Sequence, residues 1–377
     1  MRILHVTEAS WAGTLQVVRS LAADQAAQGH SVTLAYSTRP ELPEGFAASV
    51  PAEIELVPVA WQRGGVSAQV NAGRALRRLA RERRPQLIHL HSSLAGAVGA
   101  LALPRDAPLI YSPHGLAFTR QDIGRATAAA VRAVEAFVVR RCALVGAVSE
   151  AEAKLARDGL RARQVAVVHN GIPELDHGVP SRPLDRAEPV VVALGRIAGA
   201  RRPAATARIL SALRPDARVG WIGGWADGDD DAAVREAGIP VTGWLPREEA
   251  LERLAEATVY LHWSAWDGMS LAILEAIARD VVVVASDIPA NREIVGARQV
   301  CADERSAIQL ARSVLEDSAL RAELLEEQRR RAPAFGARRM SAEWLAVYER
   351  TLAPVAGARM QTATSALAAR KIGEPWT

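Results

Sequence analysis

Two carboxylates, Asp267 and Glu275, stand eight residues apart in the stretch of this sequence that is richest in chemical signals. The pattern predicts a loop that ends near Ser270, then a helix, then a buried strand over residues 281–284. Asp267 would precede the helix, and Glu275 would lie about two turns into it on a similar face. Free N–H groups at the start of that helix can bind an anion. The arrangement predicts a site for a sugar that carries a diphosphate, with amides on the phosphates and carboxylates on hydroxyl groups.

The rest of the chain alternates short apolar runs with amphipathic segments, which predicts strands that alternate with helices. In the first half the expected strands are 3–7, 31–36, 54–59, 87–91, 109–112, 144–148 and 165–168, and the expected helices are 14–28, 68–83, 122–141 and a short one from Ser149. Ser149 and Glu152 have the spacing of a capping box. In the second half we expect strands at 190–194, 219–222, 241–242 and 259–262, helices from about 203, 230 and 247, and a helical segment over 306–352.

Proline and glycine are concentrated between residues 173 and 189, which indicates a linker between two domains. The repeated strand–helix order on each side predicts an α/β fold of two doubly wound, Rossmann-like domains that face each other across a cleft. We expect the first domain over 1–172 and the second over 190–340. Residues 341–377 would hold a helix that crosses back to the first domain, and the segment beyond Gly357 is expected to be a mobile tail.

The composition is that of an ordinary globular protein, with 377 residues, 49% hydrophobic and 23% charged. No apolar run approaches the length of a membrane span, and the first residues are typical of a strand rather than a signal peptide. Cys142 and Cys301 are the two cysteines, so we expect no disulfide framework and a reducing cytoplasm. The net charge is +4. The sequence has no pattern typical of nucleic-acid-binding proteins, so this class is not supported.

Several short segments together resemble the retaining glycosyltransferases of family four, the group 1 glycosyltransferases with the GT-B fold. These segments are Ala12-Gly13 and residues 89–96, 112–118, 148–150, 169–172, 194–197, 241–246 and 267–275. The resemblance covers residues 2–352 and rests on the order and spacing of the segments. Segments 89–96 and 112–118 look most like members that build bacterial exopolysaccharide, capsule or O-antigen.

The resemblance implies roles for individual residues. His114 would reach the transferred sugar, Arg196 and Arg201 would bind the diphosphate, and Glu275 would accept the ribose hydroxyl groups. The implied catalytic residues are His114, Asp267, Arg196 and Arg201. The implied donor-binding residues are Gly13, Arg196, Arg201, Gly243, Trp244, Gly268, Met269, Ser270, Leu271 and Glu275.

The chain departs from the family pattern at four positions. Asp267 stands where the family usually has glutamate, Ala12 stands in the first position of a common glycine pair, and Leu94 occupies a site that is often lysine. Arg201 stands where lysine is usual, and arginine keeps the charge and adds a planar fork for phosphate.

The implied reaction transfers a sugar from a nucleotide diphosphate, UDP- or GDP-linked, to an acceptor hydroxyl group with retention. The arginines and the helix N-terminus would stabilise the leaving diphosphate in place of a metal, so no metal and no cofactor is expected. The expected acceptor is a glycan or a lipid-linked sugar, bound by the first domain. We expect a cytoplasmic protein, with attachment to the inner face of the cytoplasmic membrane as a further hypothesis.

Other interpretations of single motifs remain open. His89 and His91 alternate along one strand and suggest metal ligands, but the favoured interpretation is a strand that ends in polar residues, because no third ligand is spaced nearby. The acidic run from Asp227 to Asp231 is more typical of a helix start than of a metal site. Arginines along 68–84 and 122–141 indicate ordinary amphipathic surface helices, with membrane attachment as the alternative.

Two other functions compete with the transferase. A nucleotide-sugar epimerase of the same fold would release the nucleotide without any acceptor, and a non-catalytic nucleotide-sugar-binding protein would release none. A phosphorylase would need a lysine for its aldimine cofactor, and neither Lys154 nor Lys371 lies in a suitable motif.

Overall fold

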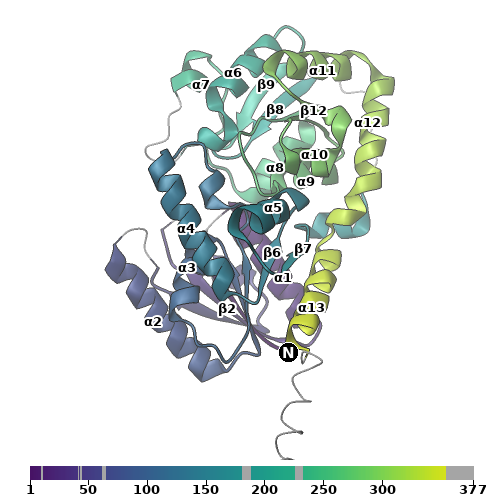
Figure 1. The fold of residues 1–377 in the computed structure, drawn as a ribbon. Helices are drawn as coiled ribbons and strands as arrows, with labels where there is room; N and C mark the ends of the chain where they lie inside the picture. The colour runs from purple at the N-terminus through teal and green to yellow at the C-terminus, as the bar shows by residue number, and fades with distance from the viewer. Residues whose placement is uncertain are drawn as a thin grey trace, which may run out of the picture.

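The computed structural model describes residues 1–9, 12–40, 42, 45–61, 65–180, 188–225 and 232–353. These residues form two α/β domains, each a parallel sheet with helices packed on it (Figure 1). The sequence prediction of two doubly wound domains is therefore confirmed.

The N-terminal domain has seven parallel strands in the order β3-β2-β1-β4-β5-β6-β7. The strands are β1 (Arg2–Thr7), β2 (Ser31–Ser37), β3 (Ile54–Val59), β4 (Leu87–His91), β5 (Leu109–Ser112), β6 (Leu144–Ala147) and β7 (Val165–Val167). The helices are α1 (Ala12–Ala27), α2 (Val66–Arg83), α3 (Ser93–Ala102), α4 (Arg125–Arg141) and α5 (Glu150–Lys154). The strand order reverses between β1 and β4, and ligands of such sheets bind at this switch point, beyond the carboxyl ends of the strands.

The C-terminal domain has five strands in the order β12-β11-β10-β8-β9. They are β8 (Val190–Leu194), β9 (Arg218–Ile222), β10 (Val259–His262), β11 (Val282–Ser286) and β12 (Val300–Cys301). The helices are α6 (Pro203–Ala212), α7 (Ala232–Glu236), α8 (Arg247–Glu256), α9 (Leu271–Ala278), α10 (Pro289–Val295), α11 (Glu304–Glu316) and α12 (Ser318–Arg331). The strand expected at 241–242 is wrong, because Val241 makes only an isolated bridge to Trp221. The acidic run from Asp227 to Asp231 lies outside the described residues.

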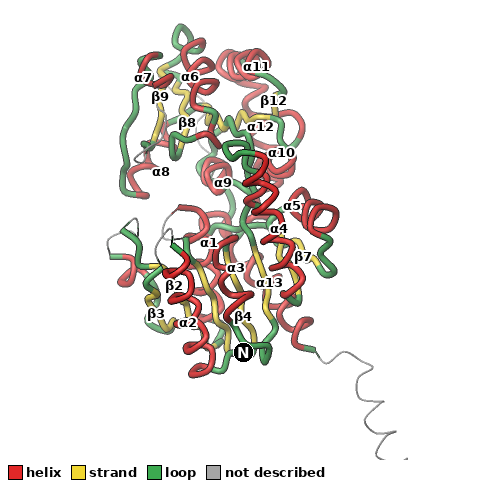
Figure 2. The backbone as a smooth tube through the Cα atoms, turned by 60° about the vertical axis from the view of Figure 1, so that its left-hand side comes forward, coloured by secondary structure: helices red, strands yellow, loops and turns green. Residues whose placement is uncertain are grey.

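The last described helix, α13 (Ala337–Leu352), runs along the N-terminal domain beside α1 (Figures 1 and 2). Met340, Trp344 and Tyr348 recur every four residues and are buried, which gives the helix an apolar face toward that domain. A Cβ atom at Gly146 would lie 2.0 Å from the Trp344 ring, so only glycine leaves room for this indole. The tail beyond Gly357 lies outside the described residues.

The proline-rich segment between the domains is partly structured. Pro173–His177 forms a 3₁₀ helix in which Leu175 is buried. The Asp176 carboxylate accepts a hydrogen bond from the Arg338 amide at 2.9 Å, which ties this helix to α13. The expected linker therefore begins with an anchored turn, and residues 181–187 lie outside the described part of the chain.

Helix α3 was not among the expected elements, because its sequence is rich in glycine and alanine. The structure shows why small residues are needed there. A Cβ atom at Gly96 would lie 2.5 Å from the Tyr111 ring, and one at Gly99 would lie 2.7 Å from Leu90. The helix thus packs directly on β4 and β5 and fixes the carboxyl ends of both strands.

Candidate active site

The two domains meet at two glycines. A Cβ atom at Gly268 would lie 2.7 Å from the backbone nitrogen of Gly115 and 3.0 Å from its Cα atom. Gly268 precedes α9, and Gly115 follows β5 with a φ of 107°. Near this contact, the Gln121 amide donates a hydrogen bond to the Ala265 carbonyl at 3.1 Å. The contact places the loop that carries His114 directly against the loop that carries Asp267.

We call the contact between Gly115 and Gly268 the seam. Arg201 and Asp267 form an ion pair on the C-terminal side of the seam. Arg201 Nη1 lies 2.8 Å from Asp267 Oδ2 and donates a second hydrogen bond to Ser264 Oγ at 2.8 Å. Burial alone would raise the pKa of Asp267, but Arg201 and His262 together hold it well below its usual range. The pair is partly accessible, with 23% and 17% of the two side chains exposed. Asp267 is therefore a carboxylate at neutral pH, and the Arg201 fork can still take a second anion.

Arg201 is held by a row of polar groups at the end of β10. Tyr260 Oη lies 2.7 Å from His262 Nδ1, and Ser264 Oγ lies 2.7 Å from His262 Nε2. Burial and the Arg201 charge together lower the pKa of His262 to about 4, against the opposing effect of Asp267. A neutral His262 adds no positive charge beside Arg201, so the guanidinium group supplies the positive charge of this cluster.

The start of α9 leaves its first N–H groups without a side-chain cap. Ser270 is the N-cap residue, yet its hydroxyl group makes no cap hydrogen bond and has no partner among the described residues. Met269 is fixed from the N-terminal domain, because Asn170 Nδ2 donates to its carbonyl at 3.4 Å. A Cβ atom at Gly13 would lie 3.5 Å from the Leu271 side chain, so α1 approaches the same helix start. An anion at this position would meet unsatisfied donors.

Glu275 lies in a second charged cluster. Its Oε1 atom accepts a hydrogen bond from Arg247 at 2.6 Å, and Arg247 also reaches Glu174 at 3.3 Å. Burial raises the pKa of Glu275, and the charges of Arg247 and Arg279 oppose that rise. The carboxylate is preorganised, but one of its oxygens already has a protein partner.

The remaining expected donor residues lie around these clusters. Arg196 follows β8, and its charge lowers the pKa of Asp122 in the N-terminal domain, after the larger effect of the Arg120 hydrogen bond. Gly243 has a φ of 74° and makes an isolated bridge to Gly223. Trp244 is 50% exposed, and its indole donates to the Trp225 carbonyl at 3.1 Å.

His114 lies on the N-terminal side of the seam in a strained turn, with a φ of 54°. Its Nε2 atom lies 3.0 Å from His91 Nδ1, and its Nδ1 atom is buried and has no hydrogen-bond partner in the part of the chain that the structure describes. Burial lowers the pKa of His114 to about 4. The ring is therefore neutral at physiological pH and carries one unused polar atom.

Glu152, which the sequence assigned to a capping box, instead holds the His114 turn. The Ser149 half of the box forms, because Ser149 Oγ accepts from the Glu152 amide at 3.1 Å. The Glu152 carboxylate accepts from the Gly115 amide at 2.7 Å and from the Val148 amide at 2.8 Å. Burial raises the pKa of Glu152 to about 7, against the effect of these two hydrogen bonds. Nothing local in the sequence shows that this side chain reaches Gly115.

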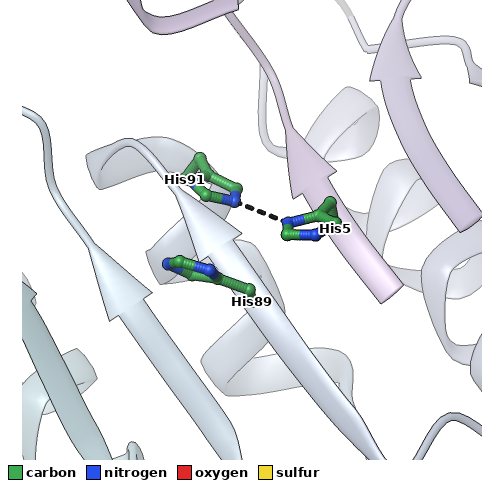
Figure 3. A group of neighbouring side chains, drawn as sticks. All are labelled: His5, His89 and His91. Atoms are coloured by element: carbon green, nitrogen blue, oxygen red, sulfur yellow. Dashed lines mark hydrogen bonds between the residues drawn. The ribbon is translucent and has the colours of Figure 1, made fainter. Parts of the chain in front are cut away.

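The expectation that His89 and His91 lack a third imidazole is wrong. His5 on β1 lies opposite His89 on β4, and ligand atoms of His5, His89 and His91 lie within 4.8 Å of one another (Figure 3). His91 is the last residue of β4, as expected of a strand that ends in polar residues, but all three rings are buried. In the described part of the chain this is the group of histidine, cysteine and acidic residues with metal-binding spacing.

Comparison with known proteins places both domains in glycosyltransferase families. Residues 11–174 match the model of Glycosyltransferase Family 4, and residues 188–317 match the model of Glycosyl transferases group 1. A comparison with curated proteins finds no match.

Solved structures share the fold over almost the whole chain. Sucrose-phosphate synthase from Thermosynechococcus elongatus has a TM-score of 0.78 at 18% identity, over 92% of this chain and 98% of that one. HepE from Anabaena in complex with UDP-glucose has a TM-score of 0.72 at 17% identity, over 92% and 99%. WaaG, a glycosyltransferase involved in lipopolysaccharide biosynthesis, has a TM-score of 0.70 at 14% identity, over 92% and 99%. These likenesses establish the GT-B fold.

The helices of the described residues include none that is both long enough and apolar enough to cross a bilayer.

Proposed function

We propose that the protein is a group 1 glycosyltransferase that transfers a sugar with retention from a nucleotide diphosphate to an acceptor hydroxyl group, because a glycosyltransferase family model matches each half of the chain. The observation that carries this proposal is the Arg201–Asp267 pair beside the uncapped start of α9, opposite His114. The cluster combines a cation and free amides for a diphosphate with a carboxylate and an imidazole for a sugar.

The donor diphosphate would bind Arg201, Arg196 and the first amides of α9. Departure of the diphosphate is the difficult step, because negative charge grows on its oxygens. Donors that are already oriented toward that charge lower the barrier, and removal of one such donor costs about 3–4 kcal/mol. We propose that these groups take the place of a divalent metal.

The transferred sugar would lie between Asp267 and His114. An ionised Asp267 accepts hydrogen bonds from sugar hydroxyl groups, and a neutral His114 can do the same through Nδ1. Glu275 would accept the ribose hydroxyl groups, with Arg247 holding it in place. The direct contact of Gly115 with Gly268 supports a site that excludes water when the domains close on the donor.

The relatives support a UDP-linked donor and a glycan acceptor. HepE was solved with UDP-glucose, and TarM from S. aureus was solved with UDP and alpha-GlcNAc-glycerol. We propose a role in bacterial surface polysaccharide or glycoconjugate synthesis, with GDP as the alternative nucleotide.

We also propose that the protein works in the cytoplasm, at the inner face of the membrane when its acceptor is lipid-linked. Helix α2 exposes Arg74, Arg77, Arg78 and Arg81, and Val66 at its start is 81% exposed. Cationic and apolar side chains on one helix are what an anionic bilayer attracts. Co-sedimentation with phosphatidylglycerol vesicles, but not with phosphatidylcholine vesicles, is the expected result. Equal sedimentation with both would refute membrane attachment.

Nucleotide release tests the main proposal. The expected result is release of nucleoside diphosphate only while acceptor is consumed, with the anomeric configuration retained in the product. Release without any acceptor would indicate an epimerase, and no release would indicate a binding protein. Glu275→Ala and Arg196→Ala should each lower turnover by about tenfold or more. Near-normal activity of both variants would contradict the assignment.

A further inference from the structure

A continuous row of hydrogen bonds runs through the N-terminal sheet to the seam. Gln25 Oε1 on α1 lies 2.8 Å from His5 Nε2. His5 Nδ1 lies 3.0 Å from His91 Nε2, the contact drawn as a dashed line in Figure 3. His91 Nδ1 then lies 3.0 Å from His114 Nε2. The first three side chains of this row are at most 1% exposed.

The chemistry of the amide gives the row a direction. The Gln25 carbonyl oxygen can only accept, so His5 Nε2 must carry the proton. A neutral imidazole has one donor and one acceptor, so His5 Nδ1 accepts from His91 Nε2–H. The same argument makes His91 Nδ1 the acceptor of His114 Nε2–H. At the end of the row, His114 Nδ1 is left as a bare lone pair.

We propose that Gln25, His5 and His91 are positioning residues that fix the tautomer of His114 and present its Nδ1 atom as a hydrogen-bond acceptor at the seam. The absence of any partner for this buried atom among the described residues supports the proposal. An unsatisfied buried polar atom is costly, and the strained His114 turn adds to that cost. A ligand that donates a hydrogen bond to Nδ1 would remove the cost of leaving this buried atom unsatisfied.

The orientation of the Gln25 amide decides the direction of the row. The structure places the Gln25 carbonyl oxygen 2.8 Å from His5 Nε2, while the Gln25 Nε2 atom makes no hydrogen bond to the described residues. The third histidine belongs to a separate branch, because both His89 nitrogens are bound, to Tyr348 at 2.6 Å and to Ser112 at 2.8 Å.

A metal ion at His5, His89 and His91 is the competing explanation. It would have to displace the hydrogen bonds that now use every ring nitrogen of these three residues. Burial lowers the pKa of all three rings, so three neutral imidazoles already have hydrogen-bond partners for both ring nitrogens without a metal ion. The hydrogen-bonded row therefore accounts for the cluster without an ion.

The consequence for catalysis rests on the proposed function. If His114 meets a hydroxyl group of the donor sugar, that group must donate, and the row selects for a hydroxyl group at that position. With the opposite tautomer, Nδ1 would carry a proton and could no longer accept. An incorrect tautomer at a catalytic imidazole can be severely damaging even when the geometry survives.

Nitrogen NMR of histidine-labelled, full-length protein at pH 7 tests the tautomer without any substrate. The His114 signal is identified by its loss in His114→Asn. The expected wild-type spectrum shows His114 protonated at Nε2 and bare at Nδ1. A wild-type His114 protonated at Nδ1 would overturn the proposal, and so would histidine signals that change when EDTA is added, because they would indicate a bound metal.

Two variants test the role of Gln25. Gln25→Met removes the acceptor at nearly constant size and should move His114 toward the Nδ1–H form. Ser112→Ala is the matched control, because it removes a buried partner of His89 and should leave the His114 tautomer unchanged. An unchanged His114 spectrum in folded Gln25→Met would overturn the role of Gln25.

Kinetics then separate this inference from the proposed function. Gln25→Met should lower kcat/KM for the donor sugar nucleotide by about tenfold, which corresponds to about 1.4 kcal/mol, while affinity for UDP alone stays unchanged. Ser112→Ala should stay within about twofold of wild type. The tautomer is measured without turnover, so an inactive protein with the expected spectrum would refute the transferase alone. Full activity in a Gln25→Met protein with the opposite tautomer would refute the catalytic role of the row.

Discussion

The buried polar groups are neutral on the N-terminal side of the seam and charged on the C-terminal side. On the N-terminal side, burial keeps His5, His91 and His114 neutral, and they satisfy one another in a row. On the C-terminal side, Arg201 and Asp267 stay charged because each stabilises the other. A neutral, hydrogen-bonding surface suits the hydroxyl groups of a sugar, and a surface with fixed positive charge suits a diphosphate. We therefore propose that the diphosphate binds to the C-terminal side, and that the sugar lies against the neutral N-terminal side.

The pH dependence of the free energy of unfolding should distinguish the neutral side from the charged side most clearly. The pKa of His5 and that of His114 are lowered from 6.5 to about 4, so these groups contribute stability above pH 6.5 that is lost as the pH falls toward 4. Each contributes up to about 3 kcal/mol. Chemical denaturation at several pH values should show a loss of several kcal/mol between pH 6.5 and 4.

Buried glutamates act in the opposite direction, and a variant isolates the histidine effect. The pKa of Glu152 is raised to about 7, so its contribution is lost as the pH rises from 4.5 to 7. His5→Gln should reduce the slope between pH 6.5 and 4 by about one proton, or about 1.4 kcal/mol per pH unit. Equal slopes in wild type and His5→Gln would contradict the neutral row.

Loss of the charge on the C-terminal side should have the largest effect on activity. Arg201→Ala removes the diphosphate ligand and leaves Asp267 buried without its partner. We expect kcat/KM to fall by about 100-fold or more, measured as nucleoside diphosphate release. Arg208→Ala is the control, because this exposed arginine pairs with Glu304 on the surface and should change activity little. Equal activity of the two variants would contradict a role for the Arg201 charge in catalysis.

Contact between the two sides can be disturbed at one glycine. Gly268→Ala places a Cβ atom 2.7 Å from the Gly115 nitrogen, and backbone cannot rotate away as a side chain does. The domains must separate slightly, so we expect kcat to fall by tens of fold, about 2 kcal/mol. Gly124→Ala is the control, because a Cβ atom at Gly124 would have no other atom within 4 Å. If both variants behaved alike, the close approach would have no role in turnover.

Removal of the imidazole should have the smallest effect on activity. His114→Asn suits the local backbone, because asparagine tolerates the positive φ of this turn. We expect kcat/KM for the donor to fall about tenfold, with the free energy of unfolding changed by less than about 1 kcal/mol. A decrease as large as that of Arg201→Ala would mean that the neutral side is not confined to sugar recognition.

The sequence predicted most of the strands, the two domains and the loop–helix–strand unit around Asp267, because these depend on local periodicity and turn residues. The histidine row depends instead on the register between β1 and β4, which brings together residues 86 apart. A parallel sheet sets such pairs through the topology of the whole domain, so no local pattern shows His5 beside His91.

Glu152 and Gln25 were missed for a similar reason. Both side chains leave helices that were expected, yet they bind groups on other elements, Gly115 and His5. Spacing predicts which face of a helix is buried, but it does not identify the polar group of another element that lies against that face.

Binding of UDP and GDP in the presence of EDTA tests the central claim most directly, because these nucleotides carry the diphosphate but not the transferred sugar. Calorimetric titration should show that wild type and His114→Asn bind one of these nucleotides equally well without a divalent metal, and that Arg201→Ala binds it at least about tenfold more weakly. Equal affinity of Arg201→Ala and wild type, or no binding by wild type until magnesium or manganese is added, would contradict the account.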